Sequence, residues 1–275
     1  METQKIMAMV FVVAALCMLN TRAAYVEDAY PAYFSYSGST GPQFWGSLSP
    51  SYAKCSNGTA QSPINIVNRD TVLNRSLNAL NIQFRDSVNA TLINYGFKVE
   101  ILFRGDAGTL VFRGKTYALS EIHWHTPSDH RIEGIQFTAE LHMVHSAADS
   151  SRAVVSVLLQ SGQSDPIVTK IQQQLSQLPM RPPNQTPPEI PLVNLNIQEL
   201  RNLTTTKRYY TYPGSLTNPP CTEGITWIII GKIGTISRAQ VASLKRPLDN
   251  GSKNNARPVQ PLNGRKVEVY QAMFP

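Results

Sequence analysis

The sequence predicts a mainly β, single-domain protein with a few short helices, and three observations support this fold class. Between about residues 62 and 160, short strand-like segments follow one another, with Gly105, Gly108 and Gly114 marking turns. The segments do not alternate with helices, which argues against the βαβ series of a nucleotide-binding sheet. Nineteen prolines and 16 glycines are spread over 275 residues, as expected for many strands and turns.

The individual elements follow from local patterns. Residues 25–55 are broken by glycine and proline and predict irregular structure. A helix is expected over 165–178, with Asp165 as its cap and Pro166 as its first residue, and a short one over 237–244. A proline-rich loop is expected over 179–191. The predicted strands are 80–84, 91–94, 98–103, 109–112, 115–125, 136–145, 154–159, 209–212 and 226–233.

The N-terminal residues predict a secretory signal over 1–23, followed by one domain over 24–275. Lys5 precedes an apolar run over 6–19, and small residues near Ala23 form a plausible cleavage site. The run is too short to anchor the chain in a membrane, and no later run is long enough. The alternative is a buried N-terminal helix.

Cysteines and glycosylation sequons agree with a secreted chain. Cys17 would leave with the signal, and Cys55 and Cys221 would then form a disulfide in an oxidising compartment, two free thiols being the alternative. Several sequons predict a glycoprotein with an extracellular or cell-wall destination. The candidate asparagines are Asn57, Asn74, Asn89, Asn184, Asn202 and Asn250.

The charge of the chain is basic but scattered. The formal net charge is +7, and loss of Glu2, Lys5 and Arg22 with the signal would leave +6. The basic residues form no stripe interleaved with aromatic residues, so a nucleic-acid partner is not expected. A mild attraction to acidic surfaces is compatible with this balance.

Histidines carry the most informative motif. His123 and His125 alternate on a predicted strand, so both imidazoles lie on one face. His142 lies on a second predicted strand, and beside the first pair it would complete three neutral nitrogen donors. Three histidines leave a tetrahedral Zn²⁺ with an open position, which is the catalytic pattern. Glu121 and Glu140 each stand two residues before a histidine, where they could orient a ligand.

Five motifs in one order resemble the α-class carbonic anhydrases from about Tyr36 to Val269. The His123-Trp124-His125 form and the run after Pro219 resemble the plant branch, which includes secreted enzymes and tuber storage proteins. Some plant members reach the chloroplast through the secretory route, so the resemblance allows the chloroplast as a second destination for this protein. The motifs are QSPINI at 61–66, HWH at 123–125, ELHMVH at 140–145, SLTNPPC at 215–221 and NARPVQP at 255–261.

The resemblance implies a central, mostly antiparallel ten-stranded twisted sheet and a Zn²⁺ cofactor on His123, His125 and His142. It implies reversible hydration of carbon dioxide to bicarbonate by zinc-bound hydroxide, in a monomer or weak dimer. Thr217 matches a threonine that orients the hydroxide, and Asp129 matches the carboxylate that accepts its hydrogen bond. The resemblance also places Asn255 beside the ligands. The pocket for carbon dioxide would contain Val144, Val154, Leu216, Trp227 and Asn218.

Three departures from the family pattern predict slower turnover. Phe97 occupies the position of the proton-shuttle histidine and carries no ionisable group. Asp129 is one methylene shorter than the usual glutamate, and Glu121 replaces a glutamine amide. The alternative function is a secreted storage or binding protein that keeps this fold with little turnover. A zinc-dependent hydrolase is a weaker reading, because the chain has no H-E-x-x-H helix.

Overall fold

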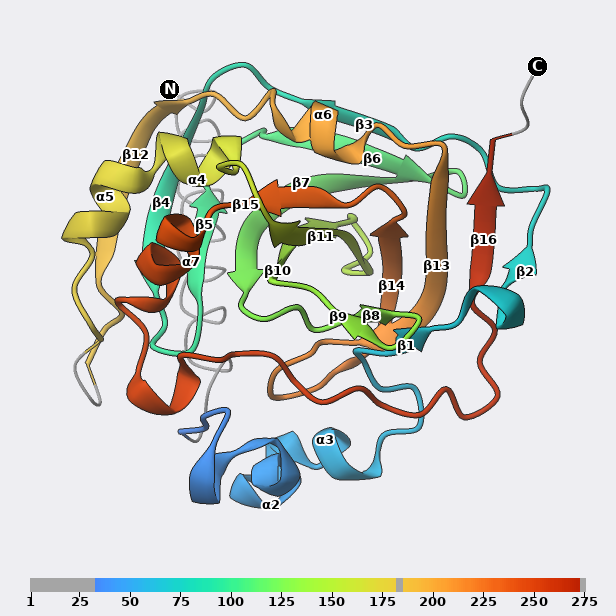
Figure 1. The fold of residues 1–275 in the computed structure, drawn as a ribbon, viewed down its shortest axis with the longest axis horizontal. Helices are drawn as coiled ribbons and strands as arrows, with labels where there is room; N and C mark the ends of the chain where they lie inside the picture. The colour runs from blue at the N-terminus through green and yellow to red at the C-terminus, as the bar shows by residue number, and fades with distance from the viewer. Residues whose placement is uncertain (1–32, 182–184, 273–275) are drawn as a thin grey trace, which may run out of the picture.

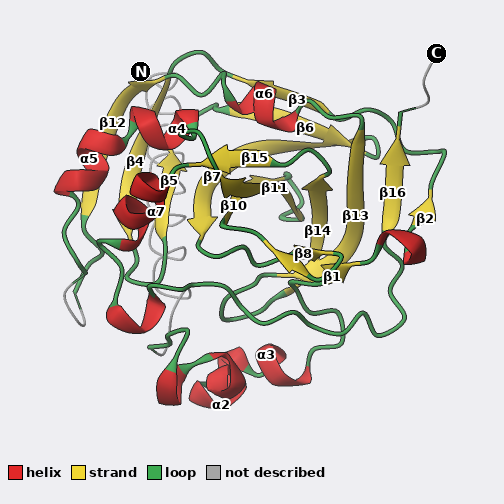
Figure 2. Ribbon diagram, viewed as in Figure 1, coloured by secondary structure: helices red, strands yellow, loops and turns green. Residues whose placement is uncertain are grey.

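The computed structural model describes residues 33–181 and 185–272. The predicted signal over 1–23 and the sequon at Asn184 therefore lie outside the described residues. Within them, a large twisted sheet forms the body of the molecule, and short helices lie at its ends and below it (Figures 1 and 2).

The main path of the sheet contains ten strands, and three more strands pair off this path. The class and twist agree with the prediction, but the described sheet has 13 strands rather than the expected ten. In order, the path is β12 (Glu189–Leu195), β4 (Val88–Asn94), β5 (Val99–Phe103), β7 (Lys115–His125), β10 (Ala139–Ser146), β11 (Arg152–Ser161), β14 (Glu223–Ile230), β13 (Arg208–Ser215), β16 (Glu268–Gln271) and β2 (Val72–Leu73).

Most neighbouring strands are antiparallel, while β11 runs parallel to β14 and β16 parallel to β2. The strands off the path are β3 (Asn81–Phe84), β6 (Gly108–Phe112) and β15 (Gly234–Ile236). A separate three-stranded sheet contains β1 (Asn65–Ile66), β8 (Arg131–Ile132) and β9 (Ile135–Gln136).

The described helices are all short. The α-helices are α2 (Trp45–Leu48), α3 (Lys54–Asn57), α4 (Pro166–Lys170), α5 (Gln172–Gln177), α6 (Leu200–Thr204) and α7 (Arg238–Lys245). Turns of 3-10 helix cover Gly38–Thr40, Pro42–Phe44, Pro50–Tyr52, Asn68–Asp70 and Asn250–Ser252.

Strand β10 and the C-terminal end of β7 are buried on both faces, because each face packs against a different layer. Alternation sends Trp124 and Leu141 into the main hydrophobic core. It sends the histidines to the opposite face, where Val144 joins a second apolar cluster with Val154. Burial of this apolar surface on both sides fixes the register, since a one-residue slip would exchange the two faces.

The predicted helix over 165–178 is two helices. Asp165 caps α4 as expected, and its carboxylate accepts from the amides of Ile167 and Val168. The helix breaks at Ile171, whose φ of −103° and ψ of 5° lie outside the helical range. Ile171 and Leu175 are nevertheless fully buried, so the predicted apolar face is correct although the helix is interrupted.

Two predicted segments differ in a way that affects the site. The strand over 136–145 is interrupted at Phe137 and Thr138, so that β9 joins the small sheet and β10 the large one. The expected loop over 179–191 gives way to β12 from Glu189, with Pro191 inside it. Proline lacks an amide donor, and β12 accommodates it because it is an edge strand.

The N-terminal described segment is joined to the sheet by aromatic packing and a disulfide. Phe34, Trp45 and Tyr52 form a third buried cluster, which also contains Phe97. The predicted disulfide between Cys55 and Cys221 is present. It links α3 to the loop that follows β13.

Candidate metal centre

Three histidines from β7 and β10 meet on the buried face of the sheet. His142 lies opposite His123 in the antiparallel register, and His125 follows on the same face of β7. The three side chains are 5%, 1% and 1% exposed, in the order His123, His125 and His142. One ring nitrogen from each lies within 4.8 Å of the others. The structure thus brings together the three histidines that the sequence predicted as metal ligands.

Backbone and carboxylate oxygens orient two of the three rings. His125 Nδ1 donates to the carbonyl of Asn255 at 2.6 Å, and its Nε2 has no protein hydrogen-bond partner. His142 Nε2 lies 2.7 Å from Glu140 Oε1, which leaves Nδ1 facing His123 Nε2 at 3.2 Å. The free nitrogens therefore converge, and such an arrangement is stable when a cation lies between their lone pairs.

The protonation of the rings also fits a metal ion. Burial and the charge of Lys98 hold the pKa of His123 well below its usual value. Burial also lowers the pKa of His125. Neutral imidazoles have free lone pairs, and a set of three is the donor set of a catalytic Zn²⁺ site. These residues fit Zn²⁺ both in geometry and in donor chemistry.

Glu140 is the centre of a buried hydrogen-bond network. Its oxygens accept from the amide of His130 at 2.7 Å and from Ser156 Oγ at 2.6 Å, and Oε1 lies 2.7 Å from His130 Nδ1. His130 Nε2 in turn lies 2.7 Å from the hydroxyl of Tyr212. Burial alone would raise the pKa of Glu140, but His130 and His142 outweigh it and hold the pKa well below its usual value.

Glu121 approaches His123 but is held differently. Its Oε1 lies 3.2 Å from His123 Nδ1, which still has no aligned hydrogen bond, so the contact is close but poorly directed. The same oxygen lies 3.3 Å from the ammonium of Lys98, which lies 2.5 Å from Glu100. Sequence reasoning missed Lys98 and Glu100, although their alternation before and within β5 places both on one face.

Asp129 does not reach Thr217. Its Oδ1 accepts from the amide of Arg257 at 2.7 Å, while Oδ2 has no hydrogen-bond partner and lies 3.4 Å from His125 Nδ1. The predicted hydrogen bond between Thr217 and this carboxylate is thus not formed, although Thr217 is buried as expected. The short side chain, fixed at Arg257, explains the gap.

The predicted pocket residues are gathered beside the ligands. Val144, Val154 and Trp227 belong to one buried cluster, against which the partly buried Leu216 packs. The Trp227 ring centroid lies 4.9 Å from that of His142. Asn218 is also buried, and its side-chain amide donates to the carbonyl of Pro219 at 2.8 Å.

Phe97 does not face solvent. Its side chain is 4% exposed, and its ring centroid lies 4.6 Å from that of Phe34. The sequence placed it where a proton shuttle would stand. The structure instead packs it into the aromatic cluster under the N-terminal segment, so an imidazole here would be buried too. Asn255, predicted beside the ligands, donates to the Phe97 carbonyl at 3.0 Å.

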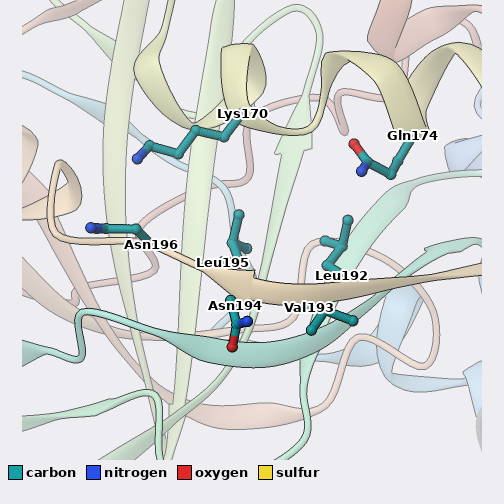
Figure 3. Close-up of a pocket in the computed structure, with 7 residues that line it drawn as sticks. All are labelled: Lys170, Gln174, Leu192, Val193, Asn194, Leu195 and Asn196. Carbon is teal, nitrogen blue, oxygen red and sulfur yellow. The ribbon is translucent and has the colours of Figure 1, made fainter.

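A surface pocket elsewhere has no connection with these residues. It lies between β12 and the helices α4 and α5, and Figure 3 shows Lys170 and Gln174 across from the strand. None of the predicted site residues lines it. Among the described residues, no helix has both the length and the apolar character needed to cross a membrane.

Comparison with known proteins identifies the family. The model of the eukaryotic-type carbonic anhydrases matches residues 40–271. The chain belongs to this family. Because the match includes both histidine strands and the Thr217 loop, the carbonic anhydrase fold and the histidine cluster occur together in one domain.

The relatives include proteins named as carbonic anhydrases and proteins named as dioscorins. Alpha carbonic anhydrase 7 of Arabidopsis thaliana is 34% identical over 95% of this chain and 93% of its own length. Dioscorin DB3L of Dioscorea polystachya is 38% identical over 92% and 90%. A solved dioscorin complexed with ascorbate has a TM-score of 0.82 at 36% identity, over 88% of this chain and 100% of its own. The plant-type carbonic anhydrase resemblance is therefore confirmed.

Proposed function

We propose that this carbonic anhydrase binds one Zn²⁺ and reversibly hydrates carbon dioxide. The observation that supports the proposal most is the convergence of His123, His125 and His142, with oxygen atoms beside their outer nitrogens. Zinc bound to such a set lowers the pKa of a water molecule to about 7 and supplies hydroxide at neutral pH.

The other residues of the site act on the substrate. Val144, Val154 and Trp227 present an apolar surface beside the histidines, which suits an uncharged linear molecule and keeps competing water away. Thr217 is buried in the loop between β13 and β14, and its hydroxyl would accept a hydrogen bond from the hydroxide. The carboxylate that should fix its hydroxyl is Asp129, whose Oδ2 has no partner. Imperfect orientation of Thr217 is one reason to expect modest turnover.

Removal of the product proton is a second reason. The chain contains five histidines. Three are the proposed ligands, and the other two, His130 and His145, are fully buried. No histidine is therefore available on the surface to pass a proton to solvent, and buffer must take that role.

The test is zinc content measured together with carbon dioxide hydration. The natural protein should hold one zinc per chain and hydrate carbon dioxide. His125→Ala should leave a folded protein that has lost most of its zinc, because one donor of three is gone. His145→Gln is the matched control, since it changes a buried histidine outside the cluster and should retain zinc. Full zinc occupancy in His125→Ala would contradict the ligand assignment.

A storage or binding protein with this fold is the second candidate. It is favoured by the unmade link between Thr217 and Asp129 and by the similarity to dioscorins. Bound zinc without measurable hydration would support it over the enzyme. Hydration that disappears with zinc removal and returns with zinc would exclude it.

We further propose that the protein is a glycoprotein of the secretory route, outside the cell or in its wall. The disulfide between Cys55 and Cys221 suits an oxidising compartment. Asn57, Asn89, Asn202 and Asn250 are exposed and Asn74 is half-exposed, so the described sequons are accessible. Deglycosylation followed by mass measurement of the secreted protein would identify the occupied sites. A protein that stays inside the cell, with unmodified mass and with Met1 still present, would refute both proposals.

A further inference from the structure

A buried lysine stands behind one of the three histidines. Lys98 is 5% exposed, and its ammonium lies between two carboxylates, 2.5 Å from Glu100 Oε2 and 3.3 Å from Glu121 Oε1. Glu121 Oε1 is also the atom that lies 3.2 Å from His123 Nδ1. A buried charge is costly unless it is paired, and here the pair adjoins the metal centre.

The strand register explains how these groups meet. In the pairing of β5 with β7, Glu100 lies opposite His123 and Leu102 opposite Glu121. Lys98 precedes Glu100 by two residues, so its side chain extends over the same face of the sheet. The cluster of Lys98, Glu100 and Glu121 is thus built by two adjacent strands and is continuous with the ligand His123.

The ammonium of Lys98 is shared between the two carboxylates. It lies within ion-pair distance of both, and the Glu121 oxygen that it contacts is the one beside His123. Lys98 therefore places a positive charge next to the carboxylate that adjoins the metal centre.

The partners of the other ligands show what is unusual here. His125 is oriented by the neutral carbonyl of Asn255, and His142 by Glu140, which lies between two imidazoles. Only Glu121 is matched by a lysine, whose ammonium contacts the same oxygen, Oε1, that lies beside His123. A cation bound by the histidines would feel both charges with opposite signs.

We propose that Lys98 is a positioning residue that cancels the charge of Glu121, so that this carboxylate acts on the metal centre as a neutral hydrogen-bonding group. The inference rests on the proposed binding of zinc by the histidines, but not on turnover. The ion pair with Lys98 holds Glu121 in place. It also offsets the attraction that an uncompensated carboxylate would exert on the metal ion.

The decisive measurement is the zinc dissociation constant of the purified, metal-depleted protein, determined by competition with a chelator. Lys98→Met should bind zinc about tenfold more tightly, because it removes a positive charge beside Glu121, and Glu121→Gln about tenfold more weakly, because it removes a negative charge beside His123 while Lys98 remains. The double variant Lys98→Met/Glu121→Gln should return close to the natural value. Lys98→Arg keeps the positive charge, so its zinc dissociation constant should also be close to the natural value.

The opposite signs separate this role from a structural one. If Lys98 only supported the fold, both single variants would weaken zinc binding, and that result would overturn the proposal, as would no change in Lys98→Met. Lys115→Met is the matched control, because Lys115 is paired with Asp149 at the surface, 2.7 Å away, and its loss should not alter affinity. The visible spectrum of the Co²⁺-loaded variants should show an unchanged three-histidine site.

Two further outcomes are informative. If Lys98→Met fails to fold, the double variant decides, since it removes both members of the ion pair between Lys98 and Glu121. The double variant must bind zinc more tightly than the single variant Glu121→Gln does. Equal zinc affinity of these two variants would refute the inference. Zinc binding by the natural protein without hydration would refute only the enzymatic function. No zinc binding by the natural protein would overturn both.

Discussion

Glu140 and Glu121 have the same task on opposite sides of the histidine cluster, but the fold holds them differently. Glu140 is fully buried in β10 and accepts from a backbone amide, a hydroxyl and two imidazoles. Glu121 is 13% exposed and depends on one lysine. The comparison indicates that hydrogen bonds replace a counter-ion where the core is deep, while a lysine is needed where few neutral donors are available.

The largest expected difference between the two sides is in stability. Glu140→Gln should lower the free energy of unfolding by about 3–5 kcal/mol, because an amide N–H would face the donors that now meet the carboxylate. Glu121→Gln should cost only about 1 kcal/mol, since Lys98 retains Glu100 as a partner. Urea unfolding of the two metal-free variants measures both values. An equal loss of unfolding free energy in the two variants would show that Glu140 and Glu121 are held equally strongly.

His145 extends the comparison along β10, because it is a buried imidazole without a carboxylate. Its Nδ1 donates to the carbonyl of Met143 at 2.9 Å, and its Nε2 has no partner. Burial lowers its pKa from 6.5 to about 4 in the folded protein. The unfolded chain therefore binds a proton between these values that the folded protein does not. Stability is fully present above pH 6.5 and decreases towards pH 4, by about 3 kcal/mol in total.

The measurement for His145 is the free energy of unfolding across this pH window, in the natural protein and in His145→Gln. The glutamine can still donate to Met143 but does not titrate, so the variant should have a flatter profile. Parallel curves for the two proteins would contradict the proposed origin of the acid sensitivity.

Asp129 offers a smaller test, because it is the carboxylate of the site with one oxygen unpaired. Asp129→Glu adds a methylene and should let the carboxylate reach Thr217 while keeping the Arg257 amide. Better orientation of Thr217 should raise the maximal rate of hydration by about tenfold. Asp129→Asn is a suitable control, since its length is unchanged. A maximal rate of hydration that does not rise in Asp129→Glu would show that another group orients Thr217.

The smallest expected effect concerns the proton. Because His130 and His145 are buried and Phe97 packs against Phe34, hydration should be limited by proton transfer in dilute buffer. Concentrated imidazole buffer should raise the rate by a few-fold. Phe97→His should not reproduce this rise, since its side chain would be buried. A rate that is independent of buffer would locate the slow step elsewhere.

The sequence predicted the histidine strands better than their surroundings, and the reason is periodicity. β7 has the predicted bounds, and in its C-terminal half Ile122 and Trp124 alternate with polar residues. The strand over 136–145 was too long, since nothing local marks the change of sheet at Phe137. β12 was missed because Pro191 resembles a loop residue until the edge position of the strand is known.

The site shows the same limit. The grouping of His123, His125 and His142 was predicted from spacing and family resemblance, and the disulfide from the cysteine count. Lys98 and Glu100 were missed because they precede Glu121 by more than 20 residues and meet it only through the pairing of β5 with β7. The burial of Phe97 was equally inaccessible, since it depends on the N-terminal aromatic cluster.

The burial of all five histidines has a consequence for the outside of the molecule. Histidine is the side chain whose ordinary pKa lies near neutrality, and none contributes to this surface. The formal charge of +7 counts the histidines as neutral, and the exposed lysines and arginines that dominate it keep their protons over the whole neutral range. Adhesion of the protein to an acidic matrix would therefore respond to ionic strength and hardly to acidity.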